Sequence, residues 1–299
     1  MKKKLSKSQL KKQRKKIKPS NNTENKLLTA FKRVFNFKPE DTVTLDELAT
    51  QAENFDYTKV FSYVKKVSLE MLKRNNEGFT NIISTLIQGS KGFSTSNQIK
   101  LNNALKKTIN SKNIYEPLLE KFRYNVSLIK DVPVDIVNSL RNKYAQGVSF
   151  RGSDIEPYLE ERLGKRAKLI IRTESAKLNS ALTEMRAKNL GLVAFVWSTS
   201  EDSRVRLSHK MMDGVLVFYS TRLSLDKMIG FAGEFPNCRC IGIPVVTLED
   251  LKFPIKVAIG NLSIETRKNQ AVITSGKIQT FTKSQFLKQY RHLFNENVG

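Results

Sequence analysis

The chain is poor in cysteine and in long apolar segments, with two cysteines among 299 residues. Two cysteines cannot build the disulfide framework of a small secreted protein, so we expect both to be reduced thiols. The longest apolar run, LGLVAFVW at 190–197, is far shorter than the roughly 20 residues that span a bilayer. The segment behind the basic N-terminus is too short in apolar length for a secretory signal. We therefore expect no membrane association and a protein that stays where it is made.

Acidic residues are also scarce. The chain has 28 Asp and Glu against 52 Lys and Arg, which gives a formal net charge of +24. Such an excess attracts polyanions, because each cation that contacts a phosphate releases a condensed counterion. The charge therefore favours non-specific binding to double-stranded DNA over binding to an anionic membrane. We expect no sequence preference, because no base-reading motif is present.

The basic residues are densest at the N-terminus, where ten of the first eighteen residues are Lys or Arg and the first acid is Glu24. A block of like charge repels itself, so residues 1–24 are predicted to be a basic disordered arm that binds DNA. A solubilising tail or a nuclear localisation signal would have a similar composition. The candidate DNA-contacting residues are Lys2, Lys3, Lys4, Lys11, Lys12, Arg14, Lys15, Lys16 and Lys18.

Behind the arm the hydrophobic pattern changes twice. Residues 25–150 carry apolar residues at spacings of three and four, which predicts amphipathic helices that pack on one another. Residues 151–255 combine a long helix that should stop at Gly191 with three short strands, at 192–199, 215–220 and 238–246. Residues 256–299 read as a polar basic C-terminal tail with one amphipathic helix at its end. The predicted fold class is α+β: an extended, mainly helical N-terminal region followed by a small α+β domain with a short sheet.

The two cysteines stand one residue apart, at Cys238 and Cys240. In a strand their sulfurs would lie on the same face, and His209 could supply a third zinc ligand. A fourth ligand is not evident: the only other histidine is His292 in the tail, and the carboxylates that might serve are Asp202, Asp213 and Glu234. We therefore expect reduced, packed cysteines and no metal or other cofactor. A zinc site on His209, Cys238 and Cys240 and a strained disulfide remain the alternatives.

No complete catalytic constellation is evident. Cysteine and histidine can act as nucleophile and base, but spacing alone does not fix their geometry. Arg172 and Glu174 are two apart on the long helix and so do not share a face; we expect each to be paired elsewhere. The sequence contains no glycine-rich phosphate loop, no H-E-x-x-H and no nucleophile elbow. We expect a protein without enzymatic activity and assign no catalytic residue.

An ordered set of motifs between about residues 130 and 245 is more informative than any single one. The set comprises an Arg-Thr-Glu on the long helix, a Trp followed by Asp-x-Arg-x-Arg-x-x-His, an Asp-Gly, and a closing Pro-x-Cys-Arg-Cys. These signature residues are Arg172, Thr173, Glu174, Trp197, Asp202, Arg204, Arg206, His209, Asp213, Gly214, Pro236, Asn237, Cys238, Arg239 and Cys240. In these motifs and their spacing, the segment resembles the phage Mu F-like domain of minor head proteins, also called the phage head morphogenesis family.

The resemblance implies a minor capsid or head morphogenesis protein, made in the bacterial host cytoplasm and enclosed in the virion. It further implies association with the portal protein inside the procapsid, possible contact with scaffold or major capsid protein, and contact with packaged DNA. Residues 25–150 are our choice for the portal-docking part, because amphipathic helices can lay an apolar face into a partner groove. Two rivals stay open: a nuclease or transferase that uses His209 and Glu174, and a stand-alone cellular nucleic-acid-binding protein.

Overall fold

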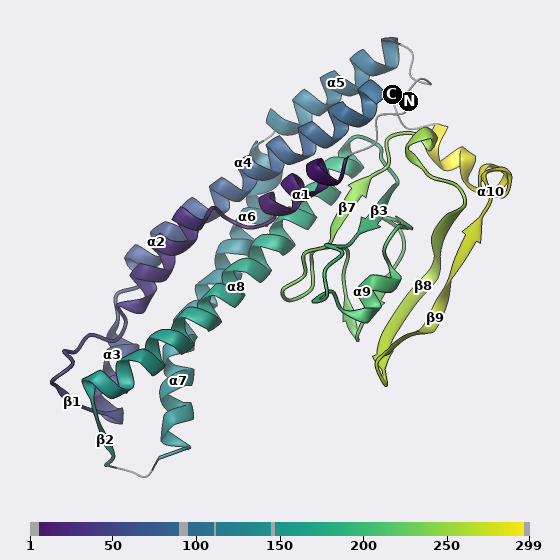
Figure 1. The fold of residues 1–299 in the computed structure, drawn as a ribbon. Coiled ribbons are helices and arrows are strands. Elements are labelled where there is room, and N and C mark those ends of the chain that lie inside the picture. Colours follow the sequence, from purple (N-terminus) through teal and green to yellow (C-terminus); the bar gives the residue numbers. More distant parts are fainter. Residues whose placement is uncertain (1–5, 90–94, 111, 145–146, 296–299) are drawn as a thin grey trace. The chain divides into compact units, whose positions relative to one another are not determined.

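The computed structural model describes residues 6–89, 95–110, 112–144 and 147–295 (Figure 1). The helices are α1 (Lys7–Lys16), α2 (Asn21–Lys32), α3 (Leu45–Asn54), α4 (Thr58–Gly89), α5 (Thr95–Asn110), α6 (Lys112–Ser127), η1 (Leu128–Lys130), α7 (Asp131–Arg141), α8 (Gly152–Asn189), α9 (Leu207–Met211), η2 (Leu248–Asp250) and α10 (Lys283–Asn295). The strands are β1 (Thr42–Thr44), β2 (Ser149–Arg151), β3 (Ala194–Ser198), β4 (Val215–Phe218), β5 (Leu223–Leu225), β6 (Met228–Ile229), β7 (Ile241–Pro244), β8 (Ile255–Arg267) and β9 (Gln270–Phe281). The α+β class is confirmed.

Two compact units make up the chain. Unit 1 contains residues 1–17, 71–118 and 176–299, and unit 2 contains residues 18–70 and 119–175. The units are therefore interleaved along the sequence, unlike the four consecutive regions expected from composition. Among the described residues, no helix combines the length and the apolar character needed to cross a bilayer.

Unit 2 is built from amphipathic helices and one small antiparallel pair, β1 with β2. The apolar stripe expected on α4 is buried as predicted, with Val60 and Val67 at 0% exposure. Arg172 on α8 also has a partner in this unit: its Nε donates to Glu24 Oε1 at 2.8 Å. Glu24 is almost fully buried, so the guanidinium of Arg172 compensates a carboxylate that would be costly to bury alone.

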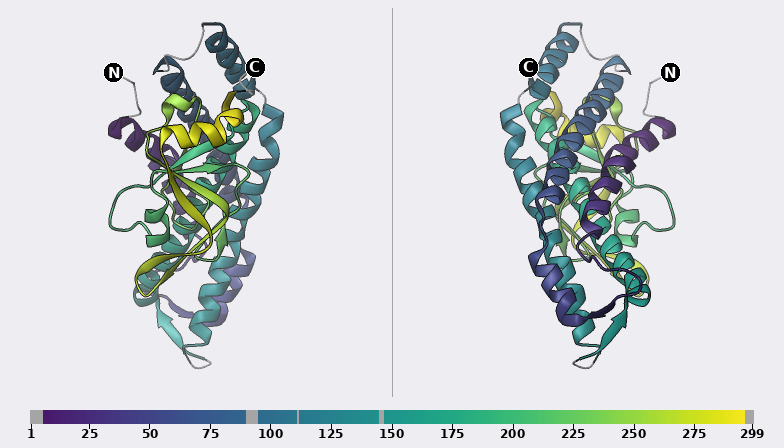
Figure 2. Two further views of the ribbon diagram at one scale, coloured as in Figure 1. Left: turned by 90° about the vertical axis from the view of Figure 1, so that its right-hand side faces the viewer. Right: turned by 90° about the vertical axis from the view of Figure 1, so that its left-hand side faces the viewer.

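The sheet of unit 1 has the strand order β6-β5-β8-β4-β3-β7, with β9 paired to β8. β3 is antiparallel to β4 and β7, whereas β8 runs parallel to β4 through its first half and parallel to β5 through its second. β9 pairs with β8 along almost its whole length and forms the long twisted hairpin at the C-terminal end of the colour scale in Figures 1 and 2. β8 thus connects the β6–β5 part of the mixed sheet to the β4–β3–β7 part.

Alternate residues of the central strands enter two different cores. Phe195, Trp197, Val215 and Val217 pack on one face with α9. Their neighbours Ala194, Leu216 and Phe218 pack on the other face, which the apolar side of α10 covers. The buried strands expected at 192–199 and 215–220 are confirmed, with all four residues of β4 buried.

The helix α8 ends where the sequence indicated. Gly191 has φ +73° and its N–H donates to Lys188 O at 2.9 Å, while Leu192 N donates to Ala187 O at 2.9 Å. This pair of bonds is the Schellman arrangement, in which a glycine in the left-handed region closes the helix. The turn directs the chain from α8 straight into β3.

Two predicted segments differ from the structure. Instead of a disordered arm, the described part of 1–24 forms α1 and the start of α2, because Ser6 and Gln9 close a reciprocal capping box and Ile17 is buried. Instead of a tail, 256–281 forms the β8–β9 hairpin. Its outer strand β9 is exposed at nearly every position, so its sequence looks polar. The amphipathic helix expected near the end is present as α10.

Candidate functional site

The signature residues of unit 1 centre on His209, Cys238 and Cys240. The Sγ atoms of both cysteines lie 3.5 Å from His209 Nδ1, and the three donor atoms lie within 4.8 Å of one another. All three side chains are buried, with exposures of 2%, 6% and 3% in that order. Two thiols and an imidazole therefore form one compact cluster that solvent does not reach.

The cysteines meet through a turn and not through a strand. The prediction that 238–246 is a strand is wrong at both ends, since β7 spans Ile241–Pro244 only. Asn237 has φ +54° and Cys238 N donates to Phe235 O at 2.9 Å, so the chain turns immediately before β7. This turn, rather than the alternation of a strand, directs both sulfurs toward α9, where His209 lies.

Aromatic side chains enclose the cluster. The His209 ring lies edge-on to Phe235, with centroids 4.8 Å apart, and edge-on to Trp197 at 5.7 Å. Trp197 and Phe235 are themselves buried to 0% and 1% exposure. An apolar wall of this kind lowers the local dielectric, which makes an uncompensated charge costly.

Hydrogen bonds between the signature residues fix the loops around the cluster. Arg239 forms a two-pronged ion pair with Asp202, including Nη2 to Oδ1 at 2.7 Å, and this bond lowers the pKa of the Asp202 carboxyl to about 2. Arg206 Nη2 donates to Pro236 O at 2.8 Å. Asp213 Oδ1 accepts from Thr199 N at 2.7 Å, which holds the turn between α9 and β4. These contacts therefore fix the loops on either side of the cluster.

The two thiols differ electrostatically. A hydrogen bond from the Cys240 thiol lowers the pKa of Cys238, burial opposes this, and the adjacent His209 lowers it further. The same sulfur–sulfur bond, together with burial, raises the pKa of Cys240. The cluster thus favours one thiolate that is stabilised by a thiol and an imidazole.

The remaining signature residues lie elsewhere. Arg172, Thr173 and Glu174 belong to unit 2, where Arg172 binds Glu24 and Glu174 Oε2 accepts from Asn125 Nδ2 at 2.7 Å. Arg172 and Glu174 are thus each paired within unit 2, as expected from their spacing on the helix. Arg204 is exposed, and Gly214 has φ +73°, as its Asp-Gly turn requires.

Asp226 was not found from the sequence. It lies in the turn between β5 and β6 at φ +50° and accepts from Ser208 Oγ at 2.7 Å and from Thr266 N at 2.8 Å. It thereby ties α9 to the end of β8. The tripeptide around it carries no turn motif, and its partners are 18 and 40 residues away, so no local pattern indicates its role.

The predicted DNA-contacting residues divide into three groups. Lys2, Lys3 and Lys4 lie outside the described residues. Arg14 and Lys16 have internal partners: Arg14 Nη2 donates to Ser198 Oγ at 2.8 Å, and Lys16 pairs with Glu77 at 3.0 Å. Lys18 is partly buried, whereas the side chains of Lys11, Lys12 and Lys15 are exposed.

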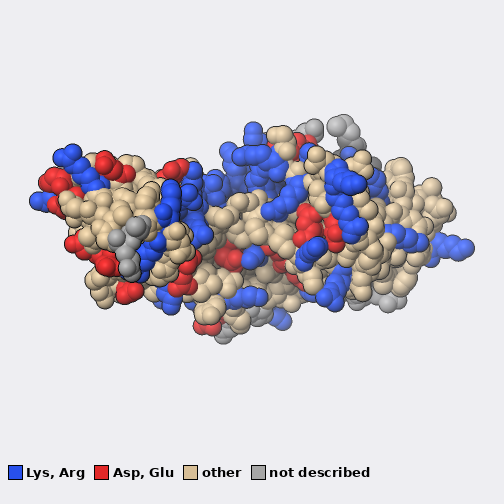
Figure 3. Space-filling view, turned by 90° about the horizontal axis from the view of Figure 1, so that it is seen from below, with Lys and Arg blue, Asp and Glu red and all other residues tan. Residues whose placement is uncertain are grey.

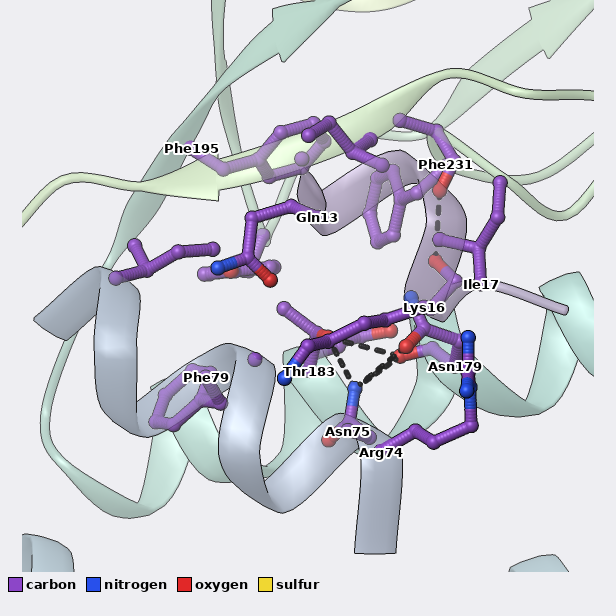
Figure 4. A pocket seen from close by; sticks show the side chains of 18 residues that line it. Gln13, Lys16, Ile17, Arg74, Asn75, Phe79, Asn179, Thr183, Phe195 and Phe231 are labelled. Carbon is purple, nitrogen blue, oxygen red and sulfur yellow. Dashed lines mark hydrogen bonds between the residues drawn. The ribbon is translucent and has the colours of Figure 1, made fainter. Parts of the chain in front are cut away.

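A small cavity lies beside α1 within unit 1 (Figure 4). Its volume is about 50 Å³. Asn75 lines the cavity, and its Nδ2 donates to Asn179 Oδ1 and Thr183 Oγ1, both at 2.9 Å. Since one water needs roughly 10–15 Å³ of such space, the cavity has room for a few water molecules and is too small for a typical substrate.

Comparison with known proteins finds a family match in the segment that carries these residues. Residues 136–243 match the family model described as Phage Mu protein F like protein, so the resemblance that the signature residues indicated is confirmed for this segment of the chain. An uncharacterized protein of Haemophilus influenzae is 35% identical over 144 residues, which cover 46% of this chain and 31% of the relative. The chain therefore matches about a third of that relative's length. No solved structure matches.

Proposed function

We propose that the chain is a minor capsid protein of a bacteriophage that acts in head morphogenesis. The observation that carries the proposal is the Mu F-like segment at 136–243, because its cluster and loop contacts engage the signature residues of unit 1 with one another. On this proposal the protein is enclosed in the capsid, binds the portal protein during assembly, and contacts packaged DNA without sequence preference. It acts by binding and catalyses no reaction.

The non-enzymatic role is supported by the burial of the groups that the rival enzyme would use. His209 is 2% exposed, and its Nδ1 faces two sulfurs, so a substrate cannot approach that nitrogen in this conformation. Glu174 is engaged by Asn125 on α6. A general acid or base has to come within hydrogen-bond reach of the reacting group, which these contacts disfavour.

The portal-docking role of the helical region is supported by large apolar side chains that unit 2 exposes. Tyr124 near the end of α6 is 68% exposed, and Leu128, four residues later in η1, is 44% exposed. Phe61 and Leu69 on α4 are exposed as well, at 38% and 49%. Interfaces draw much of their affinity from a few aromatic and large apolar anchors, so these residues are our candidates for the portal contact.

The test is co-purification of the full chain with the portal protein of the same phage. The double variant Tyr124→Ser with Leu128→Ser should retain at least about tenfold less portal protein, because interface anchors contribute about 2 kcal/mol or more. Ile229→Ser is the matched control: Ile229 is 62% exposed but lies in unit 1, so this variant should bind normally. Loss of binding in the control alone would assign docking to the Mu F-like part and refute our choice.

A further inference from the structure

The buried cluster of unit 1 has the composition of a metal site. Imidazole nitrogen and cysteine sulfur are the donors that zinc prefers, and His209, Cys238 and Cys240 place one nitrogen and two sulfurs together. We propose that these three residues bind one Zn²⁺ ion. This goes beyond the proposed function, and it replaces the metal-free cluster expected from the sequence.

The distances fit tetrahedral coordination. With Zn–S bonds of about 2.3 Å and Zn–N bonds of about 2.0–2.1 Å, the nitrogen–sulfur edge of a tetrahedron is about 3.6 Å and the sulfur–sulfur edge about 3.8 Å. The two nitrogen–sulfur distances from His209 Nδ1 are both 3.5 Å, and all donor pairs lie within 4.8 Å. The donors therefore need only small movements to bind an ion between them.

Separate elements hold the three ligands in place. His209 lies on α9, which Asp226 fixes through the neighbouring Ser208. Cys238 follows a turn closed by its own bond to Phe235 O, at 2.9 Å. Cys240 directly precedes β7, which pairs with β3. Ligands supplied by a helix, a turn and a strand entry are typical of a site that ties loops to a sheet.

Charge balance also favours an ion in this setting. Two thiolates bring two negative charges, which Zn²⁺ neutralises, and the aromatic wall of Trp197 and Phe235 separates the ion from bulk solvent. Among the described residues, no fourth His, Cys, Asp or Glu side chain joins these three donors. One water molecule enclosed with the ion would supply the fourth ligand. The role that follows is structural, because metal binding to such ligands is coupled to folding.

Metal content of the full chain tests the proposal. The protein is produced without a metal-affinity tag in zinc-supplemented medium, dialysed exhaustively against metal-free buffer, and analysed by elemental mass spectrometry. We expect about one zinc per chain in the wild type. His292→Ala should keep its zinc, since this second histidine is exposed on α10. Cys240→Ser should lose it. A wild type without zinc, whose melting temperature added zinc does not raise, would overturn the proposal.

A second measurement uses only the wild type, so it remains informative even if the Cys240→Ser variant misfolds. A thiol-specific mercurial titrated into the folded wild type should release the zinc to a colorimetric indicator, with an endpoint at two equivalents because the chain has two cysteines. Cobalt in place of zinc should give sulfur-to-metal charge-transfer absorption in the near ultraviolet. Zinc that stays bound after both thiols have reacted would show that the cysteines are not ligands. Either failure leaves the proposed role in head morphogenesis standing.

Discussion

At the scale of single residues, Arg186 is the least expected side chain in the protein. It is 0% exposed on α8, its Nη2 donates to Asn76 Oδ1, and its guanidinium lies 4.6 Å from the centroid of the Tyr115 ring. Burial lowers the pKa of Arg186, and hydrogen bonding to Tyr115 opposes that shift. Nη1 has no hydrogen-bond partner among the described residues. A buried cation with neutral partners contributes little net stability, because its desolvation offsets its contacts.

Replacing Arg186 by an apolar residue of similar length is therefore a sharp test. Arg186→Met should change the free energy of unfolding by less than about 1.5 kcal/mol, since it removes a poorly compensated charge while filling the space. Arg186→Ala should destabilise by about 2–4 kcal/mol, because it leaves a cavity between helices. Urea unfolding monitored by circular dichroism measures both. Equal losses in the two variants would mean that the polar contacts, and not the packing, stabilise this position.

The residues that could be predicted from the sequence are those whose roles depend on near neighbours. Gly191 and Gly214 follow from the local need for a positive φ, and the burial of β3 on both faces follows from its continuous apolar run. The convergence of Cys238 and Cys240 on His209 was anticipated only as one possibility. Its cause, a turn at Asn237, depends on tertiary packing rather than on the C-x-C spacing.

At the scale of elements, the β8–β9 hairpin depends on glycines at its irregular point. The register between the strands shifts between Ile259 and Ser263, and Gly260 and Gly276 both have positive φ there, at +71° and +66°. A Cβ on Gly276 would lie 2.8 Å from Ile259 O and 2.9 Å from Asn261 O. Backbone atoms at this distance cannot move aside cheaply, so the bulge requires glycine.

Gly276→Ala should therefore destabilise unit 1 by about 3 kcal/mol, from backbone strain of about 1–3 kcal/mol and a steric clash of similar size. Gly214→Ala is the matched control. It also has positive φ, at +73°, but no atom lies within 4 Å of the position that its methyl group would take, so only strain of about 1 kcal/mol applies. Denaturant unfolding followed by fluorescence of the buried Trp197 compares the two. Losses of equal size would contradict the steric argument.

The same hairpin shows why the C-terminal region was misread. The outward strand β9 is mostly exposed and lacks a two-residue alternation of burial, so it resembles a polar tail. What orders it is pairing with β8, whose residues Val257, Leu262 and Ile264 are buried to 0% exposure. Strand pairing of this kind depends on the neighbouring strand, so the composition of β9 alone does not indicate it.

At the scale of the whole molecule, the sequence gives the net charge but does not show which basic side chains the fold leaves exposed. Lys and Arg side chains are spread widely over the face shown in Figure 3, with Asp and Glu interspersed among them. Part of the lysine- and arginine-rich N-terminal segment belongs to unit 1, where Arg14 and Lys16 bind protein groups. The α1 residues that present cations to solvent are Lys11, Lys12 and Lys15.

These three lysines allow the proposed DNA contact to be tested without deleting α1, whose internal bonds a truncation would break. Replacing all three lysines by Glu reverses their charge and should weaken binding to any duplex. It should also reduce the slope of log affinity against log salt by roughly 2–3, since each phosphate contact contributes about 0.9. The control reverses Lys268, Lys277 and Lys283, three exposed lysines of the C-terminal region, with the same change in net charge. Binding is measured by fluorescence anisotropy over a salt series. If both triple variants lose affinity and slope equally, DNA responds to total charge alone, and α1 is not the contact.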